Sequence, residues 1–489
     1  MRPARTLQRA KASWPIFSIA KDMITHLQIK NFKGWRDTGV VRAAPITLFF
    51  GGNSSGKSSI GHFLLMLKQT AQSLDRKSAI QTHVSGSPVN FGSYRDIVFG
   101  RKRGEPIEFS LEWKTPEPMR LENTLSQKAW KAQHLRFDCA LRSATKAPHQ
   151  AIVSRLLYTA LDAVPLSGNR VKAPWQLGLK LRDGDESSYE AIDGALQLTG
   201  RMGRPAILGT PNRFYGFPDE FFGYYQNAQS GQDLSLELDK LLRGVAYLGP
   251  LRIHPERVYP WLGNAPESVG YDGRETVSAL LSGRERCFAF IPRGRSKPLA
   301  EIVAMKLQQL QLIHSFAIRP LSEHNQQQYE VKLRVNAHSE EVDLPDVGFG
   351  ISQVLPVLVQ LYYAPANSII VIEQPELHLH PRAQALLADV LIDVLSSREN
   401  GEPRNIQLFI ETHSEHLLVR LQRRIAEHSA KRNIEPAQVA AYVATSDGGS
   451  SQLTALEINE SGQITNWPDN FFGDQMSDLV AISQAAAGV

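Results

Sequence analysis

Eight residues have the types and the spacing needed to bind a phosphate chain. They are Gly51-Gly52-Asn53-Ser54-Ser55-Gly56-Lys57-Ser58, which fit the pattern G-x-x-x-x-G-K-S. In this pattern the backbone N–H groups surround the α- and β-phosphates, and the lysine reaches the β- and γ-phosphates. The hydroxyl of Ser58 is expected to ligate Mg²⁺, and Ser59 is a further candidate contact. The sequence therefore predicts a site for a nucleoside triphosphate.

The elements on either side of this loop must hold it in place. Ile46–Phe50 is a short apolar run suited to a buried strand, and it directly precedes the first glycine. After the loop, apolar residues recur at helical spacing, at Ile60, Phe63, Leu64 and Leu67. A strand, a glycine loop and a helix are the context that the motif requires. The start of the helix adds a favourable partial charge for an anion.

A second candidate anion site lies in the final third of the chain. Glycines at 348 and 350 are followed by Ile351-Ser352-Gln353 and then by apolar residues at helical spacing. Gly350, Ser352 and Gln353 are therefore candidate contacts at a second helix start. Because one nucleotide needs only one phosphate loop, this second site is expected to contact the nucleotide of a partner molecule.

Two further apolar runs end in polar residues that could act on a nucleotide. Ser368–Glu373 is predicted as a central parallel strand with a carboxylate at its end, and Glu373 is expected to hold Mg²⁺ through a water. Gln374 and Glu376 follow it. The next such strand, residues 407–411, precedes His413, which is expected to contact the γ-phosphate, the alternative being a structural histidine.

His378 and His380 form a different candidate set. With Glu376 they could be taken as metal ligands, but the first coordination shell would be incomplete.

The composition excludes several classes of protein. The chain has 489 residues, 42% hydrophobic and 21% charged, with a net charge of +5, which predicts two or three globular domains or lobes and permits a DNA partner without requiring one. The cysteines, Cys139 and Cys287, have no metal-like spacing and favour the reducing cytoplasm. No apolar run approaches the ~20 residues of a membrane helix, so no membrane partner is expected.

The chain is expected to divide into five parts. Residues 1–22 read as a loose extension, with the start of translation at Met1 or Met23 left open. Residues 23–113 would form the N-terminal part of an ATPase head, 114–240 a mixed and mobile insertion, and 241–345 a second lobe or connector. Residues 346–489 would complete the head. Within the insertion, the aromatic cluster between 214 and 225 is read as core packing or a protein interface rather than a base-stacking surface.

Together these motifs resemble those of ABC-type ATPases of the SMC/RecF branch, with Walker A at 51–58, a signature-like segment at 350–353, Walker B at 369–373 and a switch-like His413. Within that branch, residues 373–381 and 412–414 look like a coiled-coil-poor group. This group includes the ATPase parts of OLD-family nucleases and the ATPase subunit of Septu antiphage systems. The tail at 466–474 resembles the tails of predicted ATPases of this group.

The resemblance implies an α/β, two-lobed P-loop head with a mixed β-sheet and flanking helices. Two such heads would dimerise around two ATP molecules with Mg²⁺, with Gly350 and Ser352 reaching the γ-phosphate held by the other head. Closure would then gate a separately encoded effector, such as a nuclease of an antiphage system. Gln374 stands where members of the group carry a catalytic glutamate, so hydrolysis is expected to be slow or to borrow Glu376.

The motifs also permit two other functions. One alternative is a RecF-like repair ATPase that acts directly on DNA, and another is a non-hydrolysing nucleotide-binding scaffold. No intrinsic nuclease is expected, because fewer than eighty residues follow His413 and a TOPRIM domain needs ~100. Glu112-Trp113-Lys114 is a weak nuclease-like fragment. The segment Asn90–Asp96 is the candidate for the Q-loop.

Overall fold

The computed structural model describes residues 23–102, 104–166, 174–201, 207–322, 325–427 and 434–468. The extension expected at residues 1–22 and the tail from residue 469 onward lie outside this part of the chain. The described residues form two hydrophobic cores, one on each side of a central sheet. The expected α/β class is therefore confirmed.

The central sheet contains the strands predicted beside the site. Its order is β11 (Val245–Leu248), β18 (Ile369–Glu373), β21 (Gln407–Glu411), β4 (Ile46–Gly51), β22 (Val439–Ser446) and β23 (Ser451–Leu456). All neighbours pair in parallel except β22 and β23. The apolar runs of β4, β18 and β21 are buried, as parallel strands covered on both faces require. Their carboxyl ends therefore meet along one edge of the sheet.

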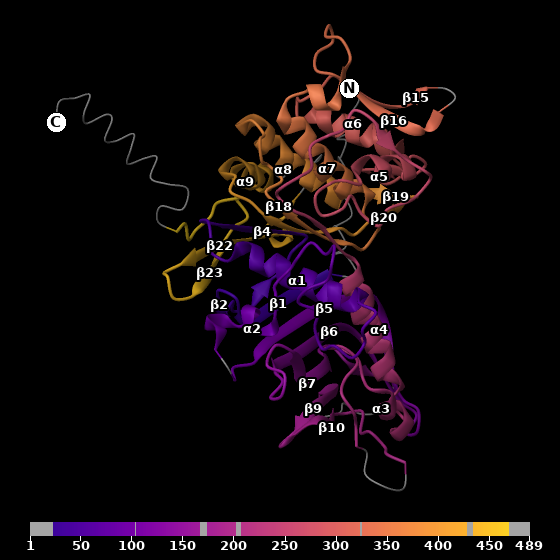
Figure 1. The fold of residues 1–489 in the computed structure, drawn as a ribbon, viewed down its shortest axis with the longest axis vertical. Coiled ribbons are helices and arrows are strands. Elements are labelled where there is room, and N and C mark those ends of the chain that lie inside the picture. Colours follow the sequence, from indigo (N-terminus) through magenta and orange to yellow (C-terminus); the bar gives the residue numbers. More distant parts are fainter. Residues whose placement is uncertain are drawn as a thin grey trace, which may run out of the picture.

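A second, antiparallel sheet of nine strands forms the lower lobe in Figure 1. Its main path is β10-β9-β7-β6-β5-β1-β2, with β3 paired to β1 and β8 paired to β6. The bounds are β1 Met23–Phe32, β2 Trp35–Asp37, β3 Val41–Arg42, β5 Ile107–Asn123, β6 Lys128–Ser143, β7 Ala151–Ala160, β8 Val164–Pro165, β9 Trp175–Arg182 and β10 Asp185–Asp193. The helices α1 (Lys57–Gln72) and α4 (Gln229–Arg243) contribute to the core shared by this sheet and the central one.

This lower lobe differs from the division expected from the sequence. Strand β5 runs without a break from Ile107 to Asn123, so the boundary expected between residues 113 and 114 falls inside it. Strands β6 to β10 extend the same sheet as β1. The aromatic cluster is core in part, since Phe214, Phe217 and Phe221 are buried there.

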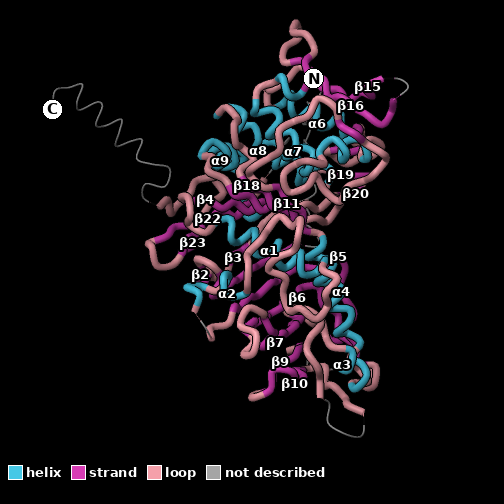
Figure 2. The backbone as a smooth tube through the Cα atoms, in the orientation of Figure 1, coloured by secondary structure: helices cyan, strands magenta, loops and turns pink. Residues whose placement is uncertain are grey.

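Helices cover the opposite face of the central sheet and form the upper lobe. Figure 2 draws α6, α7, α8 and α9 above β18 and β11, whereas α3 and α4 lie beside the lower strands. They are α5 (Thr276–Ser282), α6 (Leu299–Gln309), α7 (Phe349–Tyr363), α8 (Pro381–Leu395) and α9 (Glu415–Glu427). Helix α6 ends at Gln309, shortly before Gln311, which adopts φ 61°. None of the helices in the described ranges is both long and apolar enough to cross a membrane.

Short elements complete the two lobes. Two small sheets lie in the order β12-β16-β15, with β17 paired to β16, and β14-β13-β19-β20. Their bounds are β12 Tyr259–Pro260, β13 Cys287–Ala289, β14 Lys297–Pro298, β15 Ser315–Ser322, β16 Asn325–Arg334, β17 Val342–Asp343, β19 Arg398–Glu399 and β20 Glu402–Pro403. The short helices are α2 Tyr94–Ile97, α3 Asp219–Tyr224, η1 Phe99–Arg101, η2 Leu344–Asp346 and η3 Pro436–Gln438.

Candidate functional site

The phosphate loop joins β4 to α1, and two of its glycines are required by the backbone. Gly51 has φ 136°, and a β-carbon there would lie 2.1 Å from the carbonyl oxygen of Ala444. Gly56 has φ 94° immediately before the first residue of α1. L side chains rarely adopt such angles, so the spacing of these glycines follows from the shape of the loop. The first N–H groups of α1 have no acceptor within the helix and remain for an anion.

Lys57 lies inside this loop with 5% of its surface exposed. Its Nζ donates a 2.7 Å hydrogen bond to the carbonyl oxygen of Gly52 and lies 3.8 Å from Oε1 of Glu411. Burial lowers the pKa of Lys57, and the carboxylates of Glu411 and Glu373 oppose that effect. The lysine therefore brings positive charge to the interior of the loop.

The loop, the start of α1 and the ends of β18 and β21 surround a cavity of about 430 Å³. Eight of the predicted site residues line it: Asn53, Ser54, Gly56, Lys57, Ser58, Ser59, Gln374 and His413. Five residues outside this predicted set also line it: Lys33, Gly34, His62, Glu411 and Ser451. Strand order thus brings together residues that are far apart in the sequence.

Two carboxylates stand side by side below this cavity. Glu373 and Glu411 are register partners at the ends of the parallel strands β18 and β21. Oε1 of Glu373 accepts a 2.9 Å hydrogen bond from the hydroxyl of Tyr247 and lies 2.7 Å from Nε2 of His62. Burial raises the pKa of Glu411, against a hydrogen bond with Ser58. Glu411 therefore lies next to the predicted Mg²⁺-ligating hydroxyl.

Glu376, predicted as a catalytic residue, lies behind the cavity rather than on its wall. It is 6% exposed, and its Oε1 accepts a 2.8 Å hydrogen bond from the backbone N–H of His413. Burial raises the pKa of this carboxyl, while that hydrogen bond lowers it. In this structure Glu376 holds the turn that carries His413.

Arg252 supports the neighbouring turn, which follows β18. It is 7% exposed, and its Nη2 donates to the carbonyl oxygens of Glu373 at 2.9 Å and Gln374 at 3.3 Å. Burial lowers the pKa of Arg252 to about 10, and the charge of Glu376 opposes this. The arginine after β11 thus fixes the backbone between the Walker B carboxylate and Gln374.

Gln374 and His413 face the cavity from these supported turns. Gln374 has φ 45°, and its N–H donates a 2.7 Å hydrogen bond to the carbonyl oxygen of Glu411. The residue His413 is exposed to solvent overall, but its ring is partly buried. This partial burial and the nearby charge of Lys57 both lower the pKa of His413. The imidazole is therefore neutral at pH 7 and can donate one hydrogen bond and accept another.

Lys33 adds a second positive charge to the cavity. Its Nζ lies 3.9 Å from the ring centroid of Phe91, and burial lowers its pKa to about 8, with Glu373 opposing the shift. The neighbouring Phe32 does not line the cavity. Phe32 is fully buried against Phe63, so only the lysine is available to a ligand.

The signature-like segment is placed differently from the expectation. Helix α7 begins at Phe349, Ser352 is 6% exposed and Gln353 is 2% exposed. The hydroxyl of Ser352 donates 2.8 Å back to the carbonyl oxygen of Phe349. The expectation that this hydroxyl faces another molecule is therefore corrected, because Ser352 lies on the side of α7 that packs inward. The exposed part of the turn is Gly348 and Phe349, with Gly350 half-buried.

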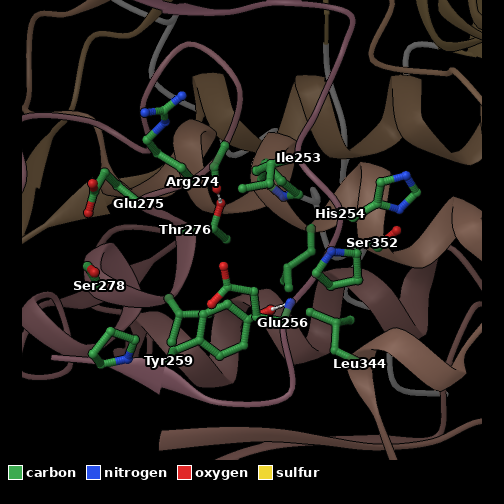
Figure 3. A pocket seen from close by; sticks show the side chains of 16 residues that line it. Ile253, His254, Glu256, Tyr259, Arg274, Glu275, Thr276, Ser278, Leu344 and Ser352 are labelled. Carbon is green, nitrogen blue, oxygen red and sulfur yellow. Dashed lines mark hydrogen bonds between the residues drawn. The ribbon is translucent and has the colours of Figure 1, made fainter. Parts of the chain in front are cut away.

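Ser352 instead borders a separate pocket of about 250 Å³, drawn in Figure 3. There its side chain lies beside His254 on the wall that also carries Ile253. This pocket shares no lining residue with the phosphate cavity. None of residues 348–353, all of them described, lines the phosphate cavity.

The structure also places His378, His380 and the candidate Q-loop segment. Nδ1 of His380 accepts from the N–H of Arg382 and caps α8, and the exposed His378 packs edge-on against Phe349 at 4.7 Å between ring centroids. Neither histidine belongs to a metal-binding group within the described residues. The segment guessed as a Q-loop, residues 90–96, does not line the cavity.

Two family models match parts of the chain. Residues 283–419, from before α6 into α9, match the model described as "AAA domain, putative AbiEii toxin, Type IV TA system". Residues 434–482 match "Protein of unknown function (DUF3696)". The first match covers β18, Gln374, β21 and His413, so this part of the chain is similar to an AAA-type ATPase domain. Neither description names OLD nucleases or the Septu subunit.

No curated protein sequence matches the chain. Among solved structures, it is similar to an "SMC head domain from Thermotoga maritima", at 11% identity and a TM-score of 0.37, over 89% of this chain and 99% of the other. It is also similar to an Smc head bound to the C-winged helix domain of ScpA, at 10% identity and a TM-score of 0.40, over 90% and 98%. A third structure is the Smc head of Pyrococcus furiosus bound to the C-terminal domain of ScpA, at 10% identity and a TM-score of 0.39, over 94% and 100%. At these scores the likenesses carry no conclusion about activity or partners.

Proposed function

We propose that this protein binds ATP with Mg²⁺ in the phosphate cavity, hydrolyses it slowly, and pairs with a second copy of itself around the nucleotide. Pairing in turn switches a separately encoded effector. The observation that carries the proposal is the assembly of Lys57, Ser58 and the carboxylates of Glu373 and Glu411 from the ends of three adjacent parallel strands.

The residues present fit a phosphate chain and its cation. Oγ of Ser55 and Oε2 of Glu411 are buried without a hydrogen-bond partner, although both belong to the immediate surroundings of the loop. The loop N–H groups and Lys57 would bind the phosphates, and Ser58 with Glu373 and Glu411 would hold Mg²⁺ directly or through water. The ion would neutralise charge on the phosphate chain.

Slow turnover follows from the groups near Gln374. A carboxamide can orient an attacking water but cannot accept its proton. Glu376 is engaged with the backbone of His413, away from the cavity. Glu411 is the nearer carboxylate, but it already hydrogen-bonds to Ser58.

Pairing is supported by the separation of the two anion-binding turns. Residues 348–353 do not line the phosphate cavity, so a nucleotide contacted by the start of α7 would belong to another copy. In place of the Ser352 hydroxyl, we propose that the backbone N–H groups of Phe349 and Gly350 make this contact, because the first N–H groups of a helix have no acceptor within it. The side chain of Phe349, 41% exposed, would be covered by the partner.

The effector is proposed to be a nuclease or another toxic enzyme of a defence system. The matched family description names a toxin of a toxin–antitoxin system, which supports a role in such systems. The test is to co-express the chain with the products of its neighbouring genes and to purify complexes with and without ATP. An ATP-dependent complex is expected. DNA binding by the isolated protein that weakens steeply with salt would instead support direct action on DNA.

A further inference from the structure

Three side chains that no part of the nucleotide site uses meet on the polar face of the lower sheet. They are His26 on β1, Glu112 on β5 and His134 on β6, and these three strands are direct neighbours. One nitrogen of each imidazole and one carboxylate oxygen all lie within 4.8 Å of one another. This is the single group of its kind in the described ranges.

An irregularity in β1 places His26 on this face. Ile24 pairs with Trp113, but the next partner of Glu112 is His26, so β1 contains one extra residue, Thr25, at that point. In a regular strand Thr25 would oppose Glu112, and His26 would point with Ile24 into the core. Such bulges redirect a side chain and recur at functional positions. Here both Thr25 and His26 reach the cluster, and Oγ1 of Thr25 lies 3.1 Å from Nε2 of His134.

The distances suit a shared cation. Oε2 of Glu112 lies 2.9 Å from Nδ1 of His26 and 3.6 Å from Nε2 of His134. Bonds of about 2.0–2.1 Å in a tetrahedral zinc site place ligand atoms about 3.3 Å apart. Nδ1 of His26 is buried, and it has no contact that meets hydrogen-bond geometry. This nitrogen is thus aimed at the carboxylate without being satisfied by it.

The second oxygen of the carboxylate has a different neighbour. Oε1 of Glu112 lies 3.7 Å from Nη1 of Arg136, whose other nitrogens bind Asp138. An outer contact of this kind orients a ligating carboxylate. The side chains of His26, His134 and Glu112 are 37%, 23% and 18% exposed, so an ion can reach the cluster from solvent.

We propose that His26 Nδ1, Glu112 Oε2 and His134 Nε2 bind a divalent transition-metal ion of the zinc class. Two imidazole nitrogens and one carboxylate oxygen are a donor set that Zn²⁺ accepts, with a fourth position left for water or the hydroxyl of Thr25. The ion would tie β1 to β5 and β6. Because β1 leads through β2 and β3 into the phosphate loop strand β4, the ion would stabilise the frame of that loop.

The test uses the full chain without a polyhistidine tag, stripped of metal with a chelator and desalted. Titration of Zn²⁺ against a chromophoric chelator is expected to show one bound ion per chain, and Co²⁺ is expected to give the absorption of a tetrahedral site. His26→Ala, His134→Ala and Glu112→Gln should each weaken Zn²⁺ binding by more than about tenfold. His149→Ala, which removes an exposed loop histidine, should leave it unchanged.

Thermal unfolding without metal shows whether each variant folds. If one of the ligand variants does not fold, His134→Asn is used instead, because it keeps a polar side chain of similar reach. In the wild type, Zn²⁺ is expected to raise the unfolding temperature, and in the ligand variants it should not. Absence of Zn²⁺ binding in the wild type, or equal binding in the ligand variants and in His149→Ala, would reduce the cluster to an ion pair and overturn the proposal.

Discussion

The molecule has two helix starts that follow glycines, and they are built for different tasks. At the start of α1, Lys57, Ser58, Glu373 and Glu411 gather around a cavity within one chain. At the start of α7, the polar side chains of Ser352 and Gln353 turn inward, and the exposed surface is backbone and Phe349. The first gathers the side chains that we propose to bind the phosphate chain, whereas the second offers only backbone donors to an anion. This difference agrees with our proposal that each forms one half of a nucleotide pocket shared by two copies.

The largest expected effect comes from removing the lysine of the phosphate loop, the proposed first half of the shared pocket. Lys57→Ala should weaken ATP binding about 100-fold, since a charge-assisted hydrogen bond is worth up to ~3 kcal/mol and about 1.4 kcal/mol is tenfold. Lys68→Ala, on the same helix but bonded to the carbonyl oxygen of Val245, is the matched control. Equilibrium binding of a fluorescent ATP analogue measures both. Equal affinities in the two variants would contradict the assignment of the cavity.

The next effect concerns the second half-site alone. Gly348→Glu should abolish ATP-dependent pairing and leave ATP binding intact, because a carboxylate there would face the partner's phosphates. A β-carbon at Gly348 meets no atom within 4 Å, so the fold tolerates the change. Gly223→Glu adds the same charge at an equally open glycine in α3. Sedimentation velocity separates the two outcomes, and loss of pairing in both variants would point to net charge rather than to this turn.

Gln374→Glu tests whether slow chemistry is built into the site. A general base contributes about 10²–10⁴-fold, so turnover is expected to rise at least about tenfold, measured as phosphate release with saturating ATP. Gln374→Ala should not increase the rate of turnover. An unchanged rate in Gln374→Glu would mean that another group, such as Glu411, already accepts the proton.

The pH dependence of ATP binding should report Lys33. Its pKa of about 8 lies below that of an ordinary lysine because of burial, so the side chain loses its charge as pH rises through 8. ATP affinity should therefore fall a few-fold between pH 7 and pH 9, in line with the ~0.2–1 kcal/mol of a partly exposed ion pair. Lys33→Ala should bind more weakly at pH 7 and lose this step. If ATP affinity had the same pH dependence in Lys33→Ala as in the wild type, Lys33 would not contact the nucleotide.

The smallest effect is expected at Ser352. Its hydroxyl bonds to Phe349 within α7, so Ser352→Ala should lower stability by about 1 kcal/mol and leave ATP binding and pairing unchanged. Thermal unfolding and sedimentation measure the two properties. Loss of pairing would restore the hydroxyl as a contact.

Local pattern predicted the first half-site well and the second only in part. The glycine spacing and the apolar runs around 51–58 are short-range signals, and the structure forms the strand, loop and helix where they indicated. The prediction for Ser352 was wrong because it considered the type of side chain and not the face of the helix on which the residue lies. It lies three residues before the buried Leu355, and that spacing puts both on one face of a helix.

Glu411 and Arg252 were missed as site residues for a different reason. Glu411 becomes a site residue because β21 lies between β4 and β18, and strand order is not encoded by any local spacing. Arg252 follows β11, and its role depends on the pairing of that strand with β18. Likewise β5 to β10 alternate as strands locally, but only their pairing shows that they extend the sheet of β1.

Light scattering on the wild-type chain tests the central claim most directly. Without nucleotide the protein should have the mass of one chain, 54.5 kDa. With saturating ATP and Mg²⁺ it should have twice that mass, because slow hydrolysis leaves the shared pockets occupied. A single-chain mass in a sample shown by equilibrium dialysis to be saturated with ATP would contradict the claim that two copies share each nucleotide.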